Sequence, residues 1–152
     1  MQIDIADLQS LYHLKKSDIE CTLKKVLGRL EKDAELSIVL VNDEKIKELH
    51  NLYLGENCAT DVLTFPLDDE TSDTKEKICG EIIISVETAI NVASDMNSNV
   101  DSEIYLYLVH GILHLIGYDD KETHMAKQMH DEEKRILKEL GMPVDIDINT
   151  GL

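Results

Sequence analysis

Two histidines, His110 and His114, stand four residues apart in the segment VHGILHLIGYDD of this 152-residue chain. On a helix, residues at this spacing lie one above the other on one face, so both imidazole rings can reach one ion. Gly117 follows, and glycine readily adopts the left-handed conformation that ends a helix and turns the chain back. Asp120 then supplies a carboxylate. Three protein ligands and an open position are typical of catalytic zinc, so the segment predicts a site for one divalent metal ion, with zinc as the first candidate.

Other interpretations fit the same residues. A histidine pair in an apolar helix can also be a hydrogen-bonded polar pair of the core. His124, one helical turn beyond Asp120, competes with it as the third ligand. We favour Asp120 because the turn at Gly117 directs the chain back toward the histidines. Asp119 is expected to orient the turn or one of the ligands through hydrogen bonds.

The expected chemistry is hydrolysis, because a metal ion with an open position lowers the pKa of bound water and polarises carbonyl and phosphoryl oxygens. The spacing H-x-x-x-H-x-x-G-x-x-D is shared with the elongated zinc-protease motif, in which a glutamate directly follows the first histidine as general base. Gly111 occupies that position here, which disfavours a peptidase. An acid from elsewhere would have to act as the base. Asp61 and Glu81 are the candidates, although both also fit carboxylates at a turn or a strand end.

The elements that position these residues can be placed by their apolar patterns. Alternating or β-branched apolar runs predict strands at 2–6, 35–41, 60–66 and 78–85. Helices are expected at 17–32, 43–53, 86–97, 101–116 and 121–140, with Ser17, Asn42 and Ser85 as N-terminal caps. The helix over 101–116 is apolar nearly all round, which predicts a central, buried helix that can hold metal ligands rigidly. The acidic stretch 67–77 is expected to be an exposed loop.

Strands and helices are mixed along the chain, and three helices follow one another at its end. We therefore expect an α+β fold with a small mixed four-stranded sheet, about five helices and the metal site on a central buried helix. The length suits a single metallohydrolase domain, expected over residues 1–144. Residues 145–152 are expected to form a loose C-terminal tail.

The charge balance bears on the partners that the chain can bind. The chain has 31 acidic and 15 basic residues, and its formal net charge is −16. Such a surface repels phosphate at long range, which argues against tight nonspecific nucleic-acid binding and against DNA as a partner. A local basic cleft for RNA remains compatible with this composition.

The cysteines and the apolar pattern bear on the compartment. Cys21, Cys58 and Cys79 form no C-x-x-C pair and are odd in number, as expected of reduced thiols in the cytoplasm. No apolar run is long enough to span a bilayer, and the first residues do not have the pattern of a secretory signal. We therefore expect a cytoplasmic protein without a membrane partner.

The chain contains the segments ATDVLTFP (59–66), CGEIIIS (79–85) and HGILHLIGYDD (110–120). They resemble the segments P-T-D-V-L-S-F-P, G-D-I-x-I-S and H-G-x-L-H-L-x-G-Y-D-H of the YbeY family of rRNA maturation factors, which are metal-dependent endoribonucleases. The three segments occur in the family's order at plausible spacing. Their combination is much more specific than any one motif.

The resemblance implies a small sheet packed with helices around a cleft that holds zinc or a related divalent metal. By match, His110 and His114 correspond to the first two metal ligands. The resemblance also implies hydrolysis of phosphodiester bonds in single-stranded RNA, linked to small-subunit rRNA maturation and ribosome quality control. RNA and ribosomal or ribosome-associated proteins are then the expected partners.

Some positions depart from the family pattern. Asp120 stands where the family has its third histidine, which favours a harder metal such as manganese or magnesium. Leu54 follows Tyr53 where the family usually has an arginine thought to serve RNA cleavage, and leucine cannot hold phosphate or stabilise developing charge. Asn57 and Ala59 replace the usual Asp and Pro. The leading hypothesis is a metal-dependent endoribonuclease. The departures motivate an alternative, a non-catalytic ribosome-associated binding protein, and a zincin-like metalloprotease is the third hypothesis.

Overall fold

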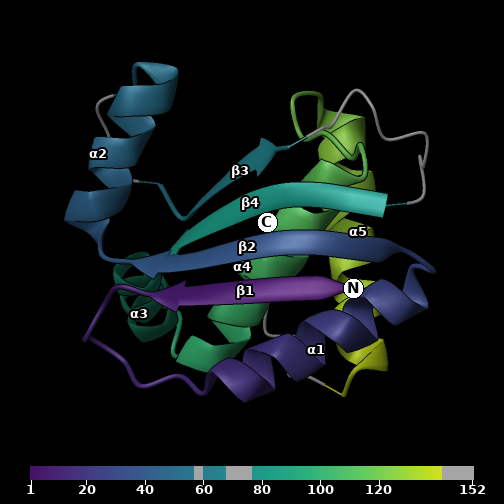
Figure 1. Ribbon diagram of the computed structural model, residues 1–152, viewed down its shortest axis with the longest axis horizontal. Coiled ribbons are helices and arrows are strands. Elements are labelled where there is room, and N and C mark those ends of the chain that lie inside the picture. Colours follow the sequence, from purple (N-terminus) through teal and green to yellow (C-terminus); the bar gives the residue numbers. More distant parts are fainter. Residues whose placement is uncertain (57–59, 68–76, 142–152) are drawn as a thin grey trace.

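The computed structural model describes residues 1–56, 60–67 and 77–141. These residues contain a four-stranded sheet and five helices (Figure 1). The strands are β1 (Gln2–Asp7), β2 (Asp33–Val41), β3 (Val62–Pro66) and β4 (Lys77–Ser85), and they lie in the order β1-β2-β4-β3. β2 pairs in parallel with β1 and β4, whereas β3 runs antiparallel to β4. The predicted mixed four-stranded sheet and α+β class are confirmed.

The helices are α1 (Lys16–Arg29), α2 (Asp43–Leu54), α3 (Val86–Asp95), α4 (Val100–Leu115) and α5 (Thr123–Glu139). One large core joins α1, α3, α4 and α5 to one face of the sheet. A smaller cluster joins α2 to the opposite face through Val41, Ile46, Leu63 and Ile83. In Figure 1, α2 accordingly stands apart from the other helices, and α4 crosses behind the strands.

Helix α4 is the central, buried helix that its composition predicts. Half of its sixteen residues are buried, and they include residues on every side of the helix. Its approach to the sheet depends on Gly111, because a Cβ atom there would lie 2.9 Å from Cγ2 of Ile82 and 3.1 Å from Cγ2 of Thr64. Position 111 therefore faces β3 and β4. The zinc-protease glutamate has no room at this position.

The helix caps follow the local sequence in most cases. Asn42 accepts a hydrogen bond from the Lys45 backbone N–H at 2.9 Å, and Ser85 accepts one from Thr88 at 3.1 Å, as predicted. The prediction for Ser17 is wrong. Helix α1 begins one residue earlier, and its first backbone hydrogen bonds are accepted by the carbonyl of Lys15. Ser17 therefore lies inside the first turn rather than before it.

Some expectations fall on residues outside the described ranges. These are Cys58, the substitutions at positions 57 and 59, the tail over 145–152 and all but the two ends of the acidic stretch 67–77. Cys21 and Cys79, in the described part, are free thiols. No helix among the described residues combines the length and the apolar character needed to cross a membrane.

Candidate metal centre

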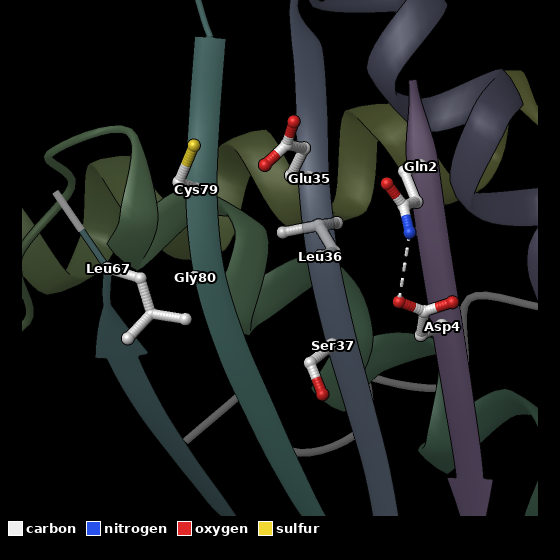
Figure 2. Close-up of a pocket in the computed structure, with 8 residues that line it drawn as sticks. All are labelled: Gln2, Asp4, Glu35, Leu36, Ser37, Leu67, Cys79 and Gly80. Carbon is white, nitrogen blue, oxygen red and sulfur yellow. Dashed lines mark hydrogen bonds between the residues drawn. The ribbon is translucent and has the colours of Figure 1, made fainter. Parts of the chain in front are cut away.

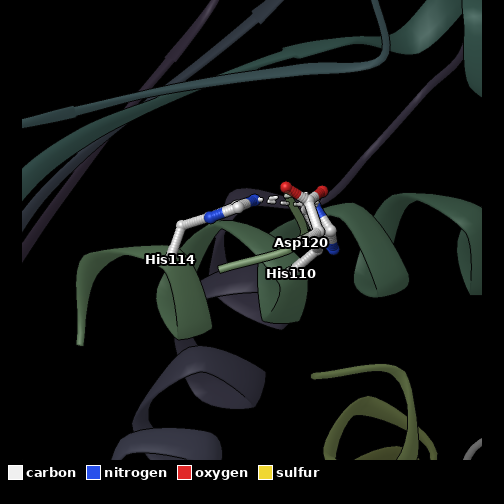
Figure 3. A group of neighbouring side chains, drawn as sticks. All are labelled: His110, His114 and Asp120. Carbon is white, nitrogen blue, oxygen red and sulfur yellow. Dashed lines mark hydrogen bonds and ion pairs between the residues drawn. The ribbon is translucent and has the colours of Figure 1, made fainter. Parts of the chain in front are cut away.

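The structure brings His110, His114 and Asp120 together at the end of α4 (Figure 3). One ligand atom from each residue lies within 4.8 Å of the other two. The Nε2 atoms of the histidines are 3.0 Å apart, and Oδ2 of Asp120 lies 3.7 Å from each of them. Two ligand atoms of a tetrahedral ion with bonds of about 2.0 Å are roughly 3.3 Å apart, so the cluster has the dimensions of a metal site.

A tight turn returns Asp120 to the histidines. Gly117 adopts a φ of 109° and donates its N–H to the carbonyl of His114 at 3.1 Å, while Tyr118 donates to Leu113 at 2.9 Å. This is the paired hydrogen bonding of a Schellman end, which requires a residue that tolerates positive φ. Asp119 then accepts a hydrogen bond from the Lys121 N–H at 3.0 Å. Gly117 and Asp119 thus shape the turn, as their positions predict.

The other ring nitrogen of each histidine is held by an acceptor. Nδ1 of His114 lies 3.2 Å from the backbone carbonyl of Tyr118, and Nδ1 of His110 contacts the carboxylate of Glu133. A carbonyl and a carboxylate only accept hydrogen bonds, so each Nδ1 carries the hydrogen. In the neutral rings, both Nε2 atoms then present lone pairs toward the carboxylate of Asp120. Three acceptors that face one another repel unless a cation lies among them, and this donor set suits a divalent metal.

The local potential also favours a cation. Burial by itself lowers the pKa of the His110 imidazole. The hydrogen bond and negative charge of Glu133, helped by the charges of Asp61 and Asp120, outweigh burial and raise that pKa above its ordinary value. The same negative groups that attract a proton attract a metal ion.

Solvent reaches the cluster. The histidine side chains are each 26% exposed, and that of Asp120 is 48% exposed. A metal ion bound here would therefore have access to water at a position not taken by protein, which is the arrangement of catalytic rather than structural zinc sites.

The competing third ligand, His124, is not a member of the cluster. The side chain of His124 is 71% exposed and lies 3.5 Å from a carboxylate oxygen of Glu122. The structure therefore favours Asp120 over His124 as the third ligand. Asp61 is exposed at the start of β3, where its carboxylate accepts the N–H of Val62 at 2.8 Å. Its charge acts on His110, so Asp61 remains a candidate base.

Glu81 is separated from the metal cluster by the sheet. Its neighbours in β4, Gly80 and Ile82, approach Leu115 and Gly111 of α4. Side chains alternate between faces along a strand, so Glu81 points to the opposite face. Cys79 shares that face and lines a hollow of about 260 Å³ there (Figure 2). The expectation that Glu81 serves as a base at the cluster does not fit this geometry.

Glu133 is a site residue that the sequence analysis missed. It lies on α5, and its side chain is only 4% exposed. A signal was present in the pattern, because the buried residues of α5 are Met129, Glu133, Ile136 and Leu137, an apolar helical stripe with one carboxylate in it. A charge at a core position of an amphipathic helix calls for a buried partner.

The fold and the cluster together define an α+β protein with a candidate metal centre at the end of its central helix. The chain belongs to the YbeY family: the family model described as endoribonuclease YbeY matches residues 4–141. The resemblance inferred from the three sequence segments is therefore confirmed.

Individual relatives agree with this assignment. An endoribonuclease YbeY from Alkaliphilus oremlandii is 34% identical over 149 residues, which cover 93% of this chain and 99% of the relative. Another, from Desulfitobacterium hafniense, is 38% identical over 122 residues, covering 76% and 78% of the two chains. The solution structure of TM1509 from Thermotoga maritima superposes with a TM-score of 0.59 at 26% identity and covers 91% of both chains.

Proposed function

We propose that the protein is a metal-dependent endoribonuclease that hydrolyses phosphodiester bonds in single-stranded RNA. The observation that carries the proposal is the convergence of His110 Nε2, His114 Nε2 and Asp120 Oδ2, with both Nδ1 atoms held from behind. The relatives named endoribonuclease YbeY support the choice of RNA as substrate. We extend the proposal to maturation of small-subunit rRNA and ribosome quality control in the cytoplasm, with RNA and ribosomal or ribosome-associated proteins as partners.

In this proposal His110, His114 and Asp120 hold the ion. A bound ion supplies a water molecule of lowered pKa and a Lewis acid for the phosphoryl oxygen. Glu133 and the carbonyl of Tyr118 keep the two imidazole rings oriented. Asp61, exposed at the start of β3 and negatively charged toward His110, is the candidate to accept a proton from the attacking water.

We propose zinc as the metal. Two imidazoles and one carboxylate form a ligand set that catalytic zinc uses in other hydrolases. The carboxylate of Asp120 is a harder ligand than the histidine of the family signature, so manganese is the strongest competitor.

The phosphate-handling part of the site differs from the family pattern at Leu54, which is 56% exposed at the end of α2. The two arginines of the chain, Arg29 and Arg135, do not replace the missing guanidinium, because both pair with Glu139. We therefore expect the metal to meet most of the charge on the phosphate. We expect the RNA cleavage rate to be lower than in relatives that carry the arginine.

The test is cleavage of a single-stranded RNA oligonucleotide by metal-stripped protein reloaded with zinc, manganese or magnesium. The double variant His110→Ala, His114→Ala should lose both metal binding and cleavage. Undiminished cleavage by that variant would contradict the proposal. If the wild-type protein turns over no RNA with any metal but still associates with ribosomal components, a non-catalytic binding role becomes the better hypothesis.

A further inference from the structure

A buried carboxylate on α5 lies between two imidazoles. Oε1 of Glu133 contacts Nδ1 of His110, and Oε2 lies 3.5 Å from Nδ1 of His130. The Glu133 side chain is 4% exposed, so its charge is removed from water and depends on these partners. His110 belongs to the cluster at the end of α4, whereas His130 has no place in the proposed reaction.

The nitrogen that carries the hydrogen in each ring follows from the chemistry of the groups. An ionised carboxylate only accepts, so each facing Nδ1 must donate. For His130 a second observation agrees, since its Nε2 atom is buried and finds no hydrogen-bond partner within the described residues. The hydrogen of that ring therefore belongs on Nδ1. The Glu133 carboxylate thus accepts a hydrogen bond from His110 and lies within ion-pair distance of Nδ1 of His130.

The Glu133 carboxylate is fixed in place by the packing of the hydrophobic core. Met129, Ile136 and Leu137 of α5 are buried with it and belong to the large core that includes much of α4. Nδ1 of His114, in contrast, depends on the Tyr118 carbonyl in the turn after α4. His110 thus has an acceptor that is charged and fixed by packing.

We propose that Glu133 is the positioning residue of the metal centre. Its carboxylate keeps the hydrogen of His110 on Nδ1, so that Nε2 presents its lone pair to the metal, and His130 fixes the second carboxylate oxygen. The inference rests on the proposed metal-dependent function. A partner of this kind orients a ligating histidine and raises its basicity, and its removal typically weakens metal binding by roughly 10- to 100-fold.

Two substitutions at position 133 separate orientation from packing. Glu133→Leu keeps much of the volume but cannot accept a hydrogen bond. Glu133→Gln has a single accepting atom on its head group, so it can serve one imidazole but not both. Glu132→Gln is the matched control, because Glu132 is the neighbouring carboxylate on α5 and pairs with Arg135. His130→Phe removes the imidazole nitrogen that faces Oε2 and keeps an aromatic ring.

Two measurements are needed for each variant. Zinc affinity is measured by competition with a chelator, and the tautomer of His110 is measured in the metal-free protein by long-range proton–nitrogen NMR in alkaline buffer. We expect zinc affinity to fall roughly 10- to 100-fold in Glu133→Leu, less in Glu133→Gln and His130→Phe, and not in Glu132→Gln. In Glu133→Leu the hydrogen of His110 should move to Nε2, where the Nε2 atom of His114, 3.0 Å away, can accept it.

Retention of the Nδ1–H tautomer and of wild-type zinc affinity in a folded Glu133→Gln protein and a folded Glu133→Leu protein would overturn the inference. If Glu133→Leu does not fold, Glu133→Gln and His130→Phe decide the question. The test of the role of Glu133 can be distinguished from the test of the proposed function. Wild-type protein that binds none of zinc, manganese and magnesium would contradict the function, whereas the tautomer of metal-free His110 would still support or overturn the role of Glu133.

Discussion

Nδ1 of His114 lies 3.2 Å from the backbone carbonyl oxygen of Tyr118, within the turn that carries the chain from α4 to Asp120. One turn therefore performs two tasks, because it orients the second histidine and delivers the third candidate ligand. Its geometry depends on Gly117, whose φ of 109° is unfavourable for any residue with a Cβ atom.

The turn can be tested with Gly117→Ala. A Cβ atom at this position meets nothing within 4 Å, so the substitution acts through backbone strain and not through a clash. We expect a loss of about 1–2 kcal/mol in the free energy of unfolding and weaker zinc binding. Gly28→Ala is the control: position 28 lies in α1 and is equally uncrowded, and alanine there should be neutral or stabilising. Equal effects of the two substitutions in denaturant unfolding would refute the assigned role of the turn.

Gly111→Glu would install the glutamate of the zinc proteases. The structure predicts destabilisation rather than a new activity, because a Cβ atom at position 111 already lies 2.9 Å from a methyl group of Ile82. Even Gly111→Ala should cost about 1–3 kcal/mol, the usual range for overpacking a core. Thermal unfolding of both variants checks this, and a stable Gly111→Glu protein that cleaves peptides would contradict it.

The choice of metal should depend on Asp120. Asp120→His restores the third imidazole of the family signature, so we expect zinc affinity to rise relative to manganese affinity. Asp120→Ala leaves two ligands and should weaken both. Calorimetric titration of metal-stripped protein with zinc and with manganese gives the ratio of the two affinities. Unchanged binding in Asp120→Ala would show that the carboxylate is not a ligand.

Leu54→Arg should raise the rate of RNA cleavage, because a guanidinium at the end of α2 can hold a phosphate and stabilise developing charge. The control is Leu52→Arg, on the same helix at a position that is 72% exposed. Both variants change the net charge equally, so a gain confined to position 54 indicates a placed arginine. Similar gains in both would mean that only the overall repulsion of RNA was reduced.

The pH dependence of the metal-free protein should reflect His110. Its pKa in the folded protein is raised above the ordinary value of 6.5, so its protonation stabilises the fold fully below that value. This contribution is lost as pH rises through the folded-state pKa. The free energy of unfolding of the metal-free protein, measured between about pH 5 and pH 9, should show this loss. The pH dependence should be weaker in His110→Gln. Zinc competes with the same proton, so its affinity should increase with pH.

Local features of this protein were predictable from its sequence, whereas features set by packing between elements were not. Asn42 and Ser85 cap their helices as predicted, because a cap depends on residues within one turn. The cluster of His110, His114 and Asp120 was also predictable, since one helix face and one turn bring its members together.

The positions of Glu81, which was assigned to the wrong face, and of Glu133, which was missed, are set by contacts between elements distant in the sequence. The face to which Glu81 points is decided by which neighbours in β4 meet α4, and periodicity alone leaves that choice open. Glu133 contacts His110 only because α5 docks on α4, a pairing that no local pattern specifies. The strand order β1-β2-β4-β3 likewise arises from the tertiary structure.

The contact between α4 and α5 has a consequence for the order of assembly. The three candidate ligands all lie in residues 110–120, so they can approach one another as soon as one helix and its turn have formed. The carboxylate that aligns His110 arrives only when α5 joins the core. A peptide spanning 100–120 would thus carry every candidate ligand, and we expect it to bind zinc more weakly than the intact protein. High-affinity metal uptake should then follow the docking of α5 on α4.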